Sequence, residues 1–509
     1  MGKGKTSMAS TLPWLRNPII YEVNTWAWLG EVGARAGKPV SLGSVPSSEW
    51  DALASWRPDA VWLMGVWERS PEGLRIALGN EGLMRSFRDA LPDLRQAEDV
   101  VGSPYCIRRY VADQRLGGPS GLAKARAELA RRGIRLVLDL VPNHVAPDHP
   151  WVREAPEYFV RGTAEEAASA PEAFLRSGGA VFARGRDPYF PPWPDVVQLD
   201  AFSPGYRRAL ADTLSGIAGQ CDAVRTDMAM LLVNRVFERT WGSRVGPPPP
   251  RELWEEVLSE VKGRHPGFVV MAEAYWDMEW ELQQLGFDYC YDKRLYDRLE
   301  HEGGESVRLH LTAGLDYQEK LVRFIENHDE PRAAASLGAK AAVGAVAVAT
   351  LPGARLFHEG QFEGRKVRLP VFLGRRPTEP VDQGTRAFYR KLLAEGTHEI
   401  YHDGKFALCE RVGFEGDRSF EDLVAWCWLL GEERRLVVVN LGHARARARM
   451  RVPWPELAGR AWRLEERLEE TAYTRDGAEL AGAGLFVELD PGKWHLFSVH
   501  HAGAARQIP

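Results

Sequence analysis

Short apolar runs alternate with longer amphipathic stretches from about residue 18 to residue 361. Runs that are apolar at nearly every position are typical of strands buried on both faces of a parallel sheet. The stretches between them place apolar residues at helical spacing, as Leu122, Ala125 and Leu129 do within 121–132. The runs that we predict to be strands are 19–24, 60–65, 135–141, 223–227, 268–272, 287–291, 322–326 and 355–358.

Eight alternating strand and helix units predict a fold of the α/β class, a (β/α)8 TIM barrel. One connection is too long for a plain loop, because residues 145–199, after the third strand, are rich in proline, glycine and aromatic residues. Such a segment is usually functional or a small inserted domain. From about residue 400 the pattern changes to short alternating strands, which include 435–440, 448–452 and 485–489 and indicate a C-terminal all-β domain.

These changes of pattern divide the chain into parts. We expect an N-terminal tail over 1–17, a barrel over 18–144 and 200–399, an inserted domain over 145–199, and a C-terminal β-sandwich domain over 400–509. The inserted domain should lie beside the mouth of the barrel, because it follows the carboxyl end of a barrel strand.

Composition narrows the class of protein. The chain contains 65 Lys and Arg and 70 Asp and Glu, which gives a formal net charge of −5. Its basic residues form no long runs, and both observations argue against a nucleic-acid partner. No stretch approaches the roughly 20 apolar residues of a membrane helix, so we expect no membrane partner. The five cysteines are widely spaced and never form C-x-x-C, which favours reduced thiols and a cytoplasmic protein. Nothing in the sequence indicates an oligomeric state.

Two short motifs match known patterns only in part. Residues 2–7 end like a phosphate-binding loop but lack its first glycine and the strand before it, so we assign them to the tail. His398 and His402 form an H-E-x-x-H match, which binds zinc when it lies on a helix. Here it lies where strand periodicity begins, so we expect a chance match rather than a metal-dependent hydrolase.

Polar clusters follow four of the predicted strands, at the points where the strands end. Because the active site of a (β/α)8 barrel lies at the carboxyl ends of its strands, we expect these clusters to meet. Each cluster alone could be a turn or a surface ion pair, but their joint occurrence favours an active site. They are Asp139 to His144 after the third strand, Arg225 to Asp227 after the fourth, Glu273 to Trp276 after the fifth and Asn327 to Asp329 after the seventh.

In order and content these clusters resemble the four conserved regions of the α-amylase superfamily, glycoside hydrolase family 13. The resemblance runs from Tyr21 to about Gly360 and extends to an inserted domain B after the third strand and a C-terminal β domain. It implies a catalytic barrel that cleaves α-glucosidic bonds with retention, through a covalent glycosyl-enzyme intermediate.

The resemblance also implies roles for individual residues. Asp227 would be the nucleophile, Glu273 the general acid and base, and Asp329 the third carboxylate, which stabilises the distorted sugar. The implied substrate-binding residues are Tyr105, His144, Arg225 and His328, and the implied supporting residues are Asp139, Asn143 and Asn327.

A calcium ion is a further implication of the resemblance. In many family members the asparagine at the position of Asn143 binds a structural calcium ion, so Asn143 is a calcium candidate here. Asp148 and Asp195 in the inserted segment are additional candidates, and each could equally cap a turn. We expect no cofactor for catalysis, because the two carboxylates suffice.

The residue types suit this chemistry. Retaining cleavage needs one carboxylate to attack the anomeric carbon and a second, protonated at first, to protonate the leaving oxygen. We expect Asp227, beside the guanidinium of Arg225, to have the lower pKa. For Glu273, which Tyr275 and Trp276 follow, we expect an apolar setting and a raised pKa.

Aromatic side chains suit sugar rings because they are rigid and apolar. The tryptophans that we consider for this role are Trp26, Trp28, Trp193, Trp276 and Trp280.

Two positions depart from the family pattern. Many amylases carry a Lys-His pair shortly after the nucleophile, where this chain reads Met228 to Leu232, so we expect a less polar acceptor side. The motif of the eighth strand ends in Gln361, where glutamate is common. Both departures argue against a standard endo-amylase and leave the catalytic carboxylates unchanged.

We therefore predict a glycosidase of the α-amylase type that hydrolyses α-glucans or maltodextrins, with an oligosaccharide or α-glucan as its partner. A transglycosylase, phosphorylase or isomerising glucosyltransferase of the same superfamily is the alternative, because transfer differs from hydrolysis only in what resolves the intermediate. The three carboxylates argue against a binding protein that has lost catalysis.

Overall fold

Eight parallel strands close into a barrel in the order β1-β14-β13-β12-β11-β10-β5-β2. The computed structural model describes residues 14–503 of the chain, so the phosphate-loop-like residues 2–7 lie outside the described residues. The predicted (β/α)8 TIM barrel is confirmed, and each predicted strand is present. The bounds are β1 (Ile19–Asn24), β2 (Ala60–Met64), β5 (Arg135–Leu140), β10 (Ala223–Thr226), β11 (Val269–Ala272), β12 (Tyr289–Tyr291), β13 (Leu321–Arg323) and β14 (Ala354–His358).

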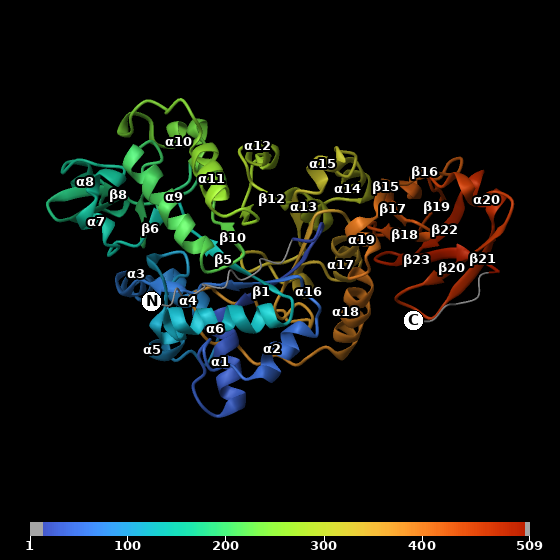
Figure 1. Cartoon of the computed structure of the whole chain (residues 1–509), viewed down its shortest axis with the longest axis horizontal. Coiled ribbons are helices and arrows are strands. Elements are labelled where there is room, and N and C mark those ends of the chain that lie inside the picture. Colours follow the sequence, from blue (N-terminus) through green and yellow to red (C-terminus); the bar gives the residue numbers. More distant parts are fainter. Residues whose placement is uncertain (1–13, 504–509) are drawn as a thin grey trace, which may run out of the picture.

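The barrel strands are buried because side chains fill the interior and helices cover the outside (Figure 1). Ile20 of β1 lies opposite Ala60 of β2 and Leu356 of β14, so these three side chains belong to the interior cluster. The helices along this part of the chain are α1 (Thr25–Ala36), α2 (Ser47–Ala54), α3 (Pro71–Leu78), α4 (Glu81–Ala90), α5 (Gln96–Asp99), α6 (Gly118–Arg131), α9 (Pro204–Ala218), α10 (Asn234–Trp241), α11 (Leu253–Arg264), α12 (Glu279–Gln284), α13 (Lys293–His301), α14 (Gly304–His310), α15 (Leu315–Gln318), α16 (Ala333–Ser336), α17 (Lys340–Thr350), α18 (Gln383–Gly396) and α19 (Ile400–Asp403).

Local sequence explains where these helices begin. The side chain of Ser203 accepts a hydrogen bond from the backbone N–H of Tyr206, and Pro204 occupies the first turn of α9. Both features are typical of helix N-termini, since they satisfy or remove backbone donors that have no helical partner. Glycine ends α1, where Gly37 adopts φ 65°, a conformation that other residues rarely take.

The segment 145–199 forms a small unit of its own beside the barrel. β6 (His144–Val145) pairs antiparallel with β9 (Val197–Gln198), so the chain leaves and re-enters the barrel at adjacent points. This pairing places the start and the end of the segment near the carboxyl end of β5. Its remaining elements are α7 (Trp151–Glu154), α8 (Glu166–Ser169) and the hairpin of β7 (Phe174–Ser177) with β8 (Ala180–Ala183).

Two sheets make up the C-terminal part of the chain. A six-stranded sheet, β15-β17-β18-β23-β20-β21, faces a three-stranded sheet, β16-β19-β22, across a shared apolar core. The predicted all-β architecture is confirmed. The bounds are β15 (Lys405–Leu408), β16 (Glu410–Val412), β17 (Leu423–Leu430), β18 (Glu433–Asn440), β19 (Ala446–Arg451), β20 (Ala461–Glu466), β21 (Ala472–Asp476), β22 (Leu485–Leu489) and β23 (Trp494–His501).

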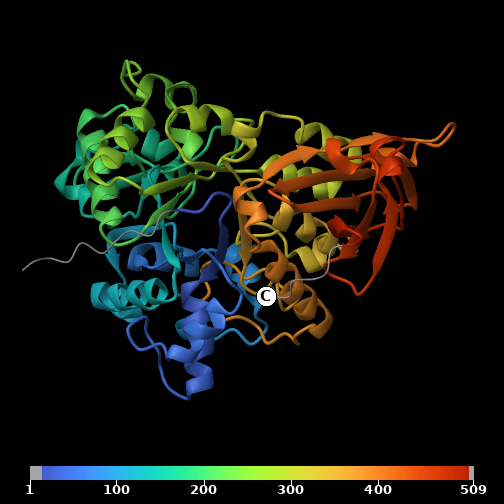
Figure 2. The ribbon, with the colours of Figure 1, turned by 45° about the vertical axis from the view of Figure 1, so that its right-hand side comes forward.

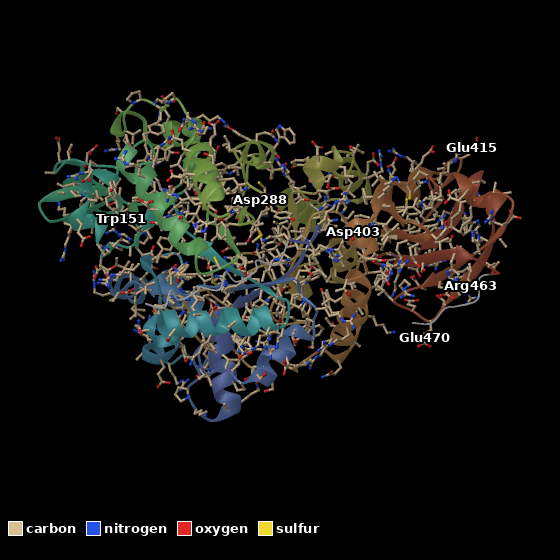
Figure 3. The ribbon with its side chains drawn as sticks, viewed as in Figure 1. Trp151, Asp288, Asp403, Glu415, Arg463 and Glu470 are labelled. Atoms are coloured by element: carbon tan, nitrogen blue, oxygen red, sulfur yellow. The ribbon has the colours of Figure 1, made fainter. Side chains whose placement is uncertain are left out.

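The inserted segment and the C-terminal sheets lie at opposite ends of the molecule. Figure 3 labels Trp151 at one end and Glu415 and Arg463 at the other. Figure 2 shows the C-terminal sheets packed beside the barrel helices. Within residues 14–503, no helix is long and apolar enough to cross a membrane.

Candidate active site

Three carboxylates from different strands line one cavity of about 370 Å³. Asp227 follows β10, Glu273 follows β11, and Asp329 follows β13 by a few residues. Asp227 and Glu273 are 7% and 3% exposed, whereas the side chain of Asp329 is 43% exposed and lies toward the opening. The residues that line the cavity are Ser103, Tyr105, His144, Trp193, Asp195, Val196, Asp227, Met228, Glu273, Tyr275 and Asp329.

The guanidinium of Arg225 joins these carboxylates. Its Nη1 donates to Oδ1 of Asp227 at 2.8 Å, and its Nη2 lies 2.8 Å from Oε1 of Glu273. The same Nη2 lies 3.7 Å from Oδ2 of Asp329. Arg225 and Asp227 are two residues apart and therefore project to the same side of β10, which explains the R-x-D spacing. A single buried cation thus fixes the positions of both central carboxylates.

Two further donors reach Glu273. The hydroxyl of Tyr275 donates to Oε1 at 2.8 Å, and the backbone N–H of Met228 donates to Oε2 at 2.7 Å. Met228 has φ 45°, a left-handed conformation that is uncommon for this residue type and that turns its N–H toward the carboxylate. The apolar setting that we expected for Glu273 is therefore wrong, because the polar groups of Tyr275 and Met228 turn toward it.

The low pKa expected for Asp227 is also wrong. Burial raises the pKa of Asp227, the negative charge of Glu273 raises it further, and the charge and hydrogen bond of Arg225 do not offset them. The pKa of Asp227 is about 7 as a result. The raised pKa of Asp227 shows that the negative charges of the two neighbouring carboxyl groups oppose each other.

His328 lies in a buried chain of polar groups behind the cavity. Its Nδ1 donates to Oε1 of Glu22, and its Nε2 lies 2.6 Å from the hydroxyl of Tyr105 and 3.0 Å from Oδ2 of Asp329. Burial opposes protonation of His328, but Asp329 and Glu22 outweigh it and raise the pKa of His328 well above its ordinary value. The imidazolium in turn lowers the pKa of Asp329, although burial acts in the opposite direction.

Glu22 belongs to the candidate site through its contact with His328, and the sequence interpretation missed it. It is 0% exposed and lies in the middle of β1, between apolar neighbours. A charged residue within a predicted buried strand is itself a signal, because such a residue needs a partner. The partner, His328, is about 300 positions away in the sequence and could not be identified without the fold.

Supporting residues shape the loops around the cavity. Oδ1 and Oδ2 of Asp139 accept hydrogen bonds from Nε1 of Trp62 at 3.1 Å and from the N–H of Gly65 at 2.9 Å. Oδ1 of Asn327 accepts from the N–H groups of Asp329 at 2.8 Å and Glu330 at 2.9 Å, which closes the turn that presents Asp329.

His144 and Tyr105 are two of the four ring side chains that line the cavity, and their surroundings differ from those of His328. His144 is buried, which lowers its pKa to about 4, and it is therefore neutral at pH 7. Its ring meets that of Trp193 edge-on at 5.2 Å. The ring of Tyr105 stacks on that of His328 at 5.5 Å, and Arg225 lies 5.4 Å from its centroid.

The five tryptophan candidates lie in four different settings. Trp28 is a core residue that packs edge-on against Trp50 at 5.0 Å. The ring of Trp26 is covered by the guanidinium groups of Arg69 and Arg115. Trp193 lines the cavity, while Trp276 and Trp280 are exposed. Trp26 and Trp28 are therefore not available to a sugar.

The residues present do not fit the calcium ion that the resemblance implies. Oδ1 of Asn143 accepts a hydrogen bond from Nε2 of Gln198 at 2.9 Å, and Nδ2 of Asn143 lies 3.3 Å from Oε1 of Gln198. Asp148 accepts from the hydroxyl of Ser70 and faces Arg108 at 3.5 Å. The neighbour of Asn143 is thus the amide of Gln198 rather than a carboxylate, and the neighbour of Asp148 is the positively charged Arg108. Both arrangements disfavour binding of a divalent cation.

The H-E-x-x-H motif does not form a metal site. His398 precedes α19, and its Nδ1 accepts from the N–H of Ile400. Nδ1 of His402 lies 2.8 Å from the carbonyl of Arg16, and Nη2 of Arg355 lies 3.4 Å from Nε2 of His402. Within the described part of the chain, no group of three or more His, Cys, Asp or Glu side chains could hold a metal ion.

Comparison with known proteins finds relatives at low identity, and no family model matches the chain. An α-amylase of Haloarcula japonica is 24% identical over 445 residues, which cover 84% of this chain and 56% of that protein. An α-1,4-glucan:maltose-1-phosphate maltosyltransferase of Pseudomonas aeruginosa is 26% identical over 211 residues, which cover 39% of this chain and 26% of that protein. The matched part is thus about half, or less, of the length of these curated relatives.

Solved structures match nearly the whole chain. A maltogenic α-amylase from Thermotoga neapolitana superimposes with a TM-score of 0.66 at 18% identity, covering 95% of this chain and 99% of that structure. An α-amylase from Geobacillus thermoleovorans superimposes with a TM-score of 0.65 at 15% identity, covering 96% and 99%. At these identities the likeness concerns the fold, a barrel with an inserted segment and a C-terminal β part.

Proposed function

Since this chain belongs to the α-amylase superfamily, we propose that it is a retaining α-glycosidase that hydrolyses α-glucans or maltodextrins. The observation that carries the proposal is the bridge that Arg225 forms between Asp227 and Glu273 within one cavity. Two carboxyl groups held close together by a buried cation within one cavity are what double displacement at a sugar requires.

In the first step Asp227 attacks the anomeric carbon while Glu273 gives its proton to the leaving oxygen. The glycosidic bond breaks, and the sugar is joined to Asp227 through an ester bond. In the second step the Glu273 carboxylate takes a proton from water, whose oxygen bonds to the anomeric carbon as the bond to Asp227 breaks. Two inversions at one carbon give net retention.

Asp329 and His328 bind hydroxyls of the sugar in this proposal. A carboxylate and an imidazolium 3.0 Å apart offer an acceptor and a donor to adjacent hydroxyls. His144, neutral at pH 7, offers a further ring nitrogen, and Tyr105 lies beneath the sugar. The negative charge of Asp329 also stabilises the positive charge that develops on the sugar in the transition state.

The proposal includes the division of the chain and its location. The catalytic barrel comprises 18–144 and 200–399, the inserted domain B-like segment 145–199, and the C-terminal domain 400–509. All five cysteines are free and buried, which supports a reducing compartment such as the cytoplasm.

Transfer to a sugar or to phosphate is the second candidate. It is favoured by the similarity to several α-1,4-glucan:maltose-1-phosphate maltosyltransferases. The same intermediate serves both reactions, so the acceptor alone decides between them.

The test is to incubate the purified protein with maltoheptaose, trehalose and sucrose, with and without phosphate, and to resolve the products by chromatography. The Asp227→Asn variant is the control. Glucose or shorter maltodextrins that appear first as the α-anomer by NMR, and are absent in the control, support the hydrolase. Longer oligomers, sugar phosphates or isomerised disaccharides support the transferase. Products that persist in Asp227→Asn contradict both.

A further inference from the structure

A second cavity lies between the inserted segment and the barrel. Its volume is about 530 Å³, and it shares no lining residue with the catalytic cavity. One wall comes from the chain just before α8 and the first residue of that helix, with Arg161 and Glu166. The other wall comes from the end of α10 and the turn after it, with Arg239 and Arg244. Figure 1 shows α8 and α10 at the same end of the molecule. We call this cavity the basic groove.

Cations outnumber carboxylates in the basic groove. Its charged lining residues are Arg161, Arg239 and Arg244 against the single carboxylate of Glu166. The chain as a whole carries a formal net charge of −5, so the positive groove differs in sign from the molecule around it. A concave site lined by one sign of charge concentrates ligands of the opposite sign.

Two of these arginines have no counter-charge. Within residues 14–503, Arg161 and Arg239 form no ion pair with a carboxylate. Nη1 of Arg161 donates to the carbonyl of Pro156 at 3.1 Å, and its guanidinium lies 4.7 Å from the ring centroid of Phe182. The guanidinium of Arg239 lies 5.5 Å from the ring centroid of Tyr189. These contacts leave most of the N–H groups of both arginines without an acceptor in the described part of the chain.

The single carboxylate is already engaged by the third arginine. Oε1 of Glu166 lies 2.7 Å from Nη2 of Arg244, and Oε2 accepts from Nη1 of Arg244 at 2.9 Å and from the N–H of Thr163 at 2.8 Å. The hydrogen bonds from Arg244 and from Thr163 lower the pKa of Glu166 to about 2. Glu166 therefore holds Arg244 in place and does not neutralise Arg161 or Arg239.

A fourth arginine lies behind the lining of the groove. Nη2 of Arg186 donates to the carbonyl of Thr240 at 2.8 Å, and its guanidinium lies 4.8 Å from the ring centroid of Trp241. Its Nε is buried and has no hydrogen-bond partner among the described residues. Burial lowers the pKa of Arg186, and the charge of Arg244 lowers it further, although Asp187 acts in the opposite direction. An anion in the groove would relieve the repulsion between these like charges.

The donor groups of the groove suit phosphate. A planar guanidinium presents paired N–H donors that match the spacing of phosphate oxygens. A phosphate monoester carries nearly two negative charges at pH 7, which balance the two unpaired arginines. The hydroxyl groups of Thr163 and Ser243 line the same groove and can donate to the remaining oxygens. A cavity of about 530 Å³ has the size of a small-molecule site rather than of a polymer-binding surface.

We propose that the basic groove binds the phosphate group of a small molecule, with Arg161 and Arg239 as its main ligands. The groove is separate from the catalytic cavity, so the proposal does not depend on the proposed function. Because Arg161 belongs to the inserted segment and Arg239 to α10, a bound phosphate holds these two parts of the chain together. Inorganic phosphate and a sugar phosphate share this chemistry, and the experiment distinguishes them.

Calorimetric titration of the full chain measures binding of inorganic phosphate and of glucose 1-phosphate, with sodium chloride keeping the ionic strength constant. We expect Arg161→Gln and Arg239→Gln each to weaken binding about tenfold, since each removes a charge-assisted contact. Arg239→Lys keeps the charge but not the paired donors and should weaken binding about threefold. Arg85→Gln in α4 is the matched control, because Arg85 is exposed and has no ion pair among the described residues. It should bind as the unaltered protein does.

The two ligands identify the source of the phosphate. Glucose 1-phosphate that binds at least about tenfold more tightly than inorganic phosphate, with both affinities lowered in Arg161→Gln and Arg239→Gln, indicates a sugar phosphate. Equal affinities of the two ligands, lowered in the same variants, indicate free phosphate.

The Tm of each variant in sodium chloride checks the fold. Arg161 and Arg239 are both exposed, so their substitution should leave this Tm unchanged. Phosphate that binds the unaltered protein and both glutamine variants equally would lie elsewhere, such as at Arg225 in the catalytic cavity, and overturns the proposal. So does a Kd weaker than about 10 mM for both ligands. Since the measurement is binding, neither outcome depends on whether the protein cleaves α-glucans.

Discussion

Glu22 shows how a residue outside the cavity controls the charge inside it. The carboxylate is 0% exposed and receives Nδ1 of His328, so the other nitrogen of that ring faces Asp329 and Tyr105. The charges of His328 and His358 lower the pKa of Glu22, although burial opposes them. We therefore predict that Glu22 is a positioning residue, which keeps His328 protonated.

We predict that Glu22→Gln moves the alkaline limb of kcat/KM to lower pH. The amide still accepts a hydrogen bond but carries no charge, so the pKa of His328 falls and the imidazolium is lost earlier as pH rises. A shift of at least about one pH unit is expected from a buried charge pair. The groups that face His328 are Glu22, Tyr105, Asp139, Asp329 and His358.

Glu279→Gln is the matched control for this experiment. Glu279 is also buried, and burial raises its pKa to about 7, so an amide resembles its protonated form. It does not line the cavity, and its replacement should leave the pH profile unchanged. A Glu22→Gln profile that coincides with that of Glu279→Gln would show that Glu22 has only a structural role.

At the scale of elements, strands were predictable from sequence and side-chain directions were not. The apolar runs identify all eight barrel strands because both faces of each strand are buried. The setting of Glu273 was mispredicted because the left-handed turns at Met228 and Trp276 redirect the chain, and a tryptophan or methionine carries no signal for such a turn. Local patterns report burial, whereas the contacts of a site depend on where separate loops meet.

The short ladder between β6 and β9 leads to a prediction about metal. The side chains of Asn143 and Gln198, 1% and 0% exposed, bind each other where the inserted segment joins the barrel. We predict that EDTA leaves Tm unchanged, because this amide pair occupies the calcium-candidate position. Gln198→Ala should destabilise the protein by about 1–3 kcal/mol, since it leaves the amide of Asn143 buried without its partner.

Thermal unfolding with and without EDTA measures both effects. Gln220→Ala is a suitable control, because Gln220 is more exposed and binds only the carbonyl of Gly216 at 3.2 Å. A fall in Tm on chelation, reversed by added calcium, would contradict the assignment of this position to the amide pair.

At the scale of the whole molecule, a buried ion-pair cluster joins the barrel to the C-terminal sheets. Glu395 of α18 is 4% exposed; its Oε1 accepts from Nε of Arg435 at 2.6 Å and its Oε2 from Nε of Arg467 at 2.8 Å. Burial opposes ionisation of Glu395, but the two guanidinium groups outweigh it and lower its pKa. Sequence could not reveal this contact, since the three residues belong to different elements.

We predict that Glu395→Gln destabilises the protein at neutral pH by about 1–3 kcal/mol, because Arg435 then loses its buried counter-charge and keeps only Glu433, whose side chain is 54% exposed. A lowered pKa means that the stabilisation is present above the ordinary pKa of glutamate and is lost as pH falls through the lower, folded-state value. The difference between the two proteins should therefore shrink on acidification. Denaturant unfolding at pH 7 and at pH 3 measures it, and a difference independent of pH would contradict the ionic origin.

The C-terminal sheets are anchored at the end of the barrel away from the cavity. Nε1 of Trp426 and Nε1 of Trp428, both in β17, donate to Thr350, which lies just before β14. These contacts lie at the amino ends of the strands, whereas the carboxylates lie at the carboxyl ends. Immobilising the protein on a solid support through the outer edge of these sheets would therefore leave the cavity at the carboxyl ends of the barrel strands open to solution. The cavity would remain accessible even to a polymer too large to pass between the protein and the support.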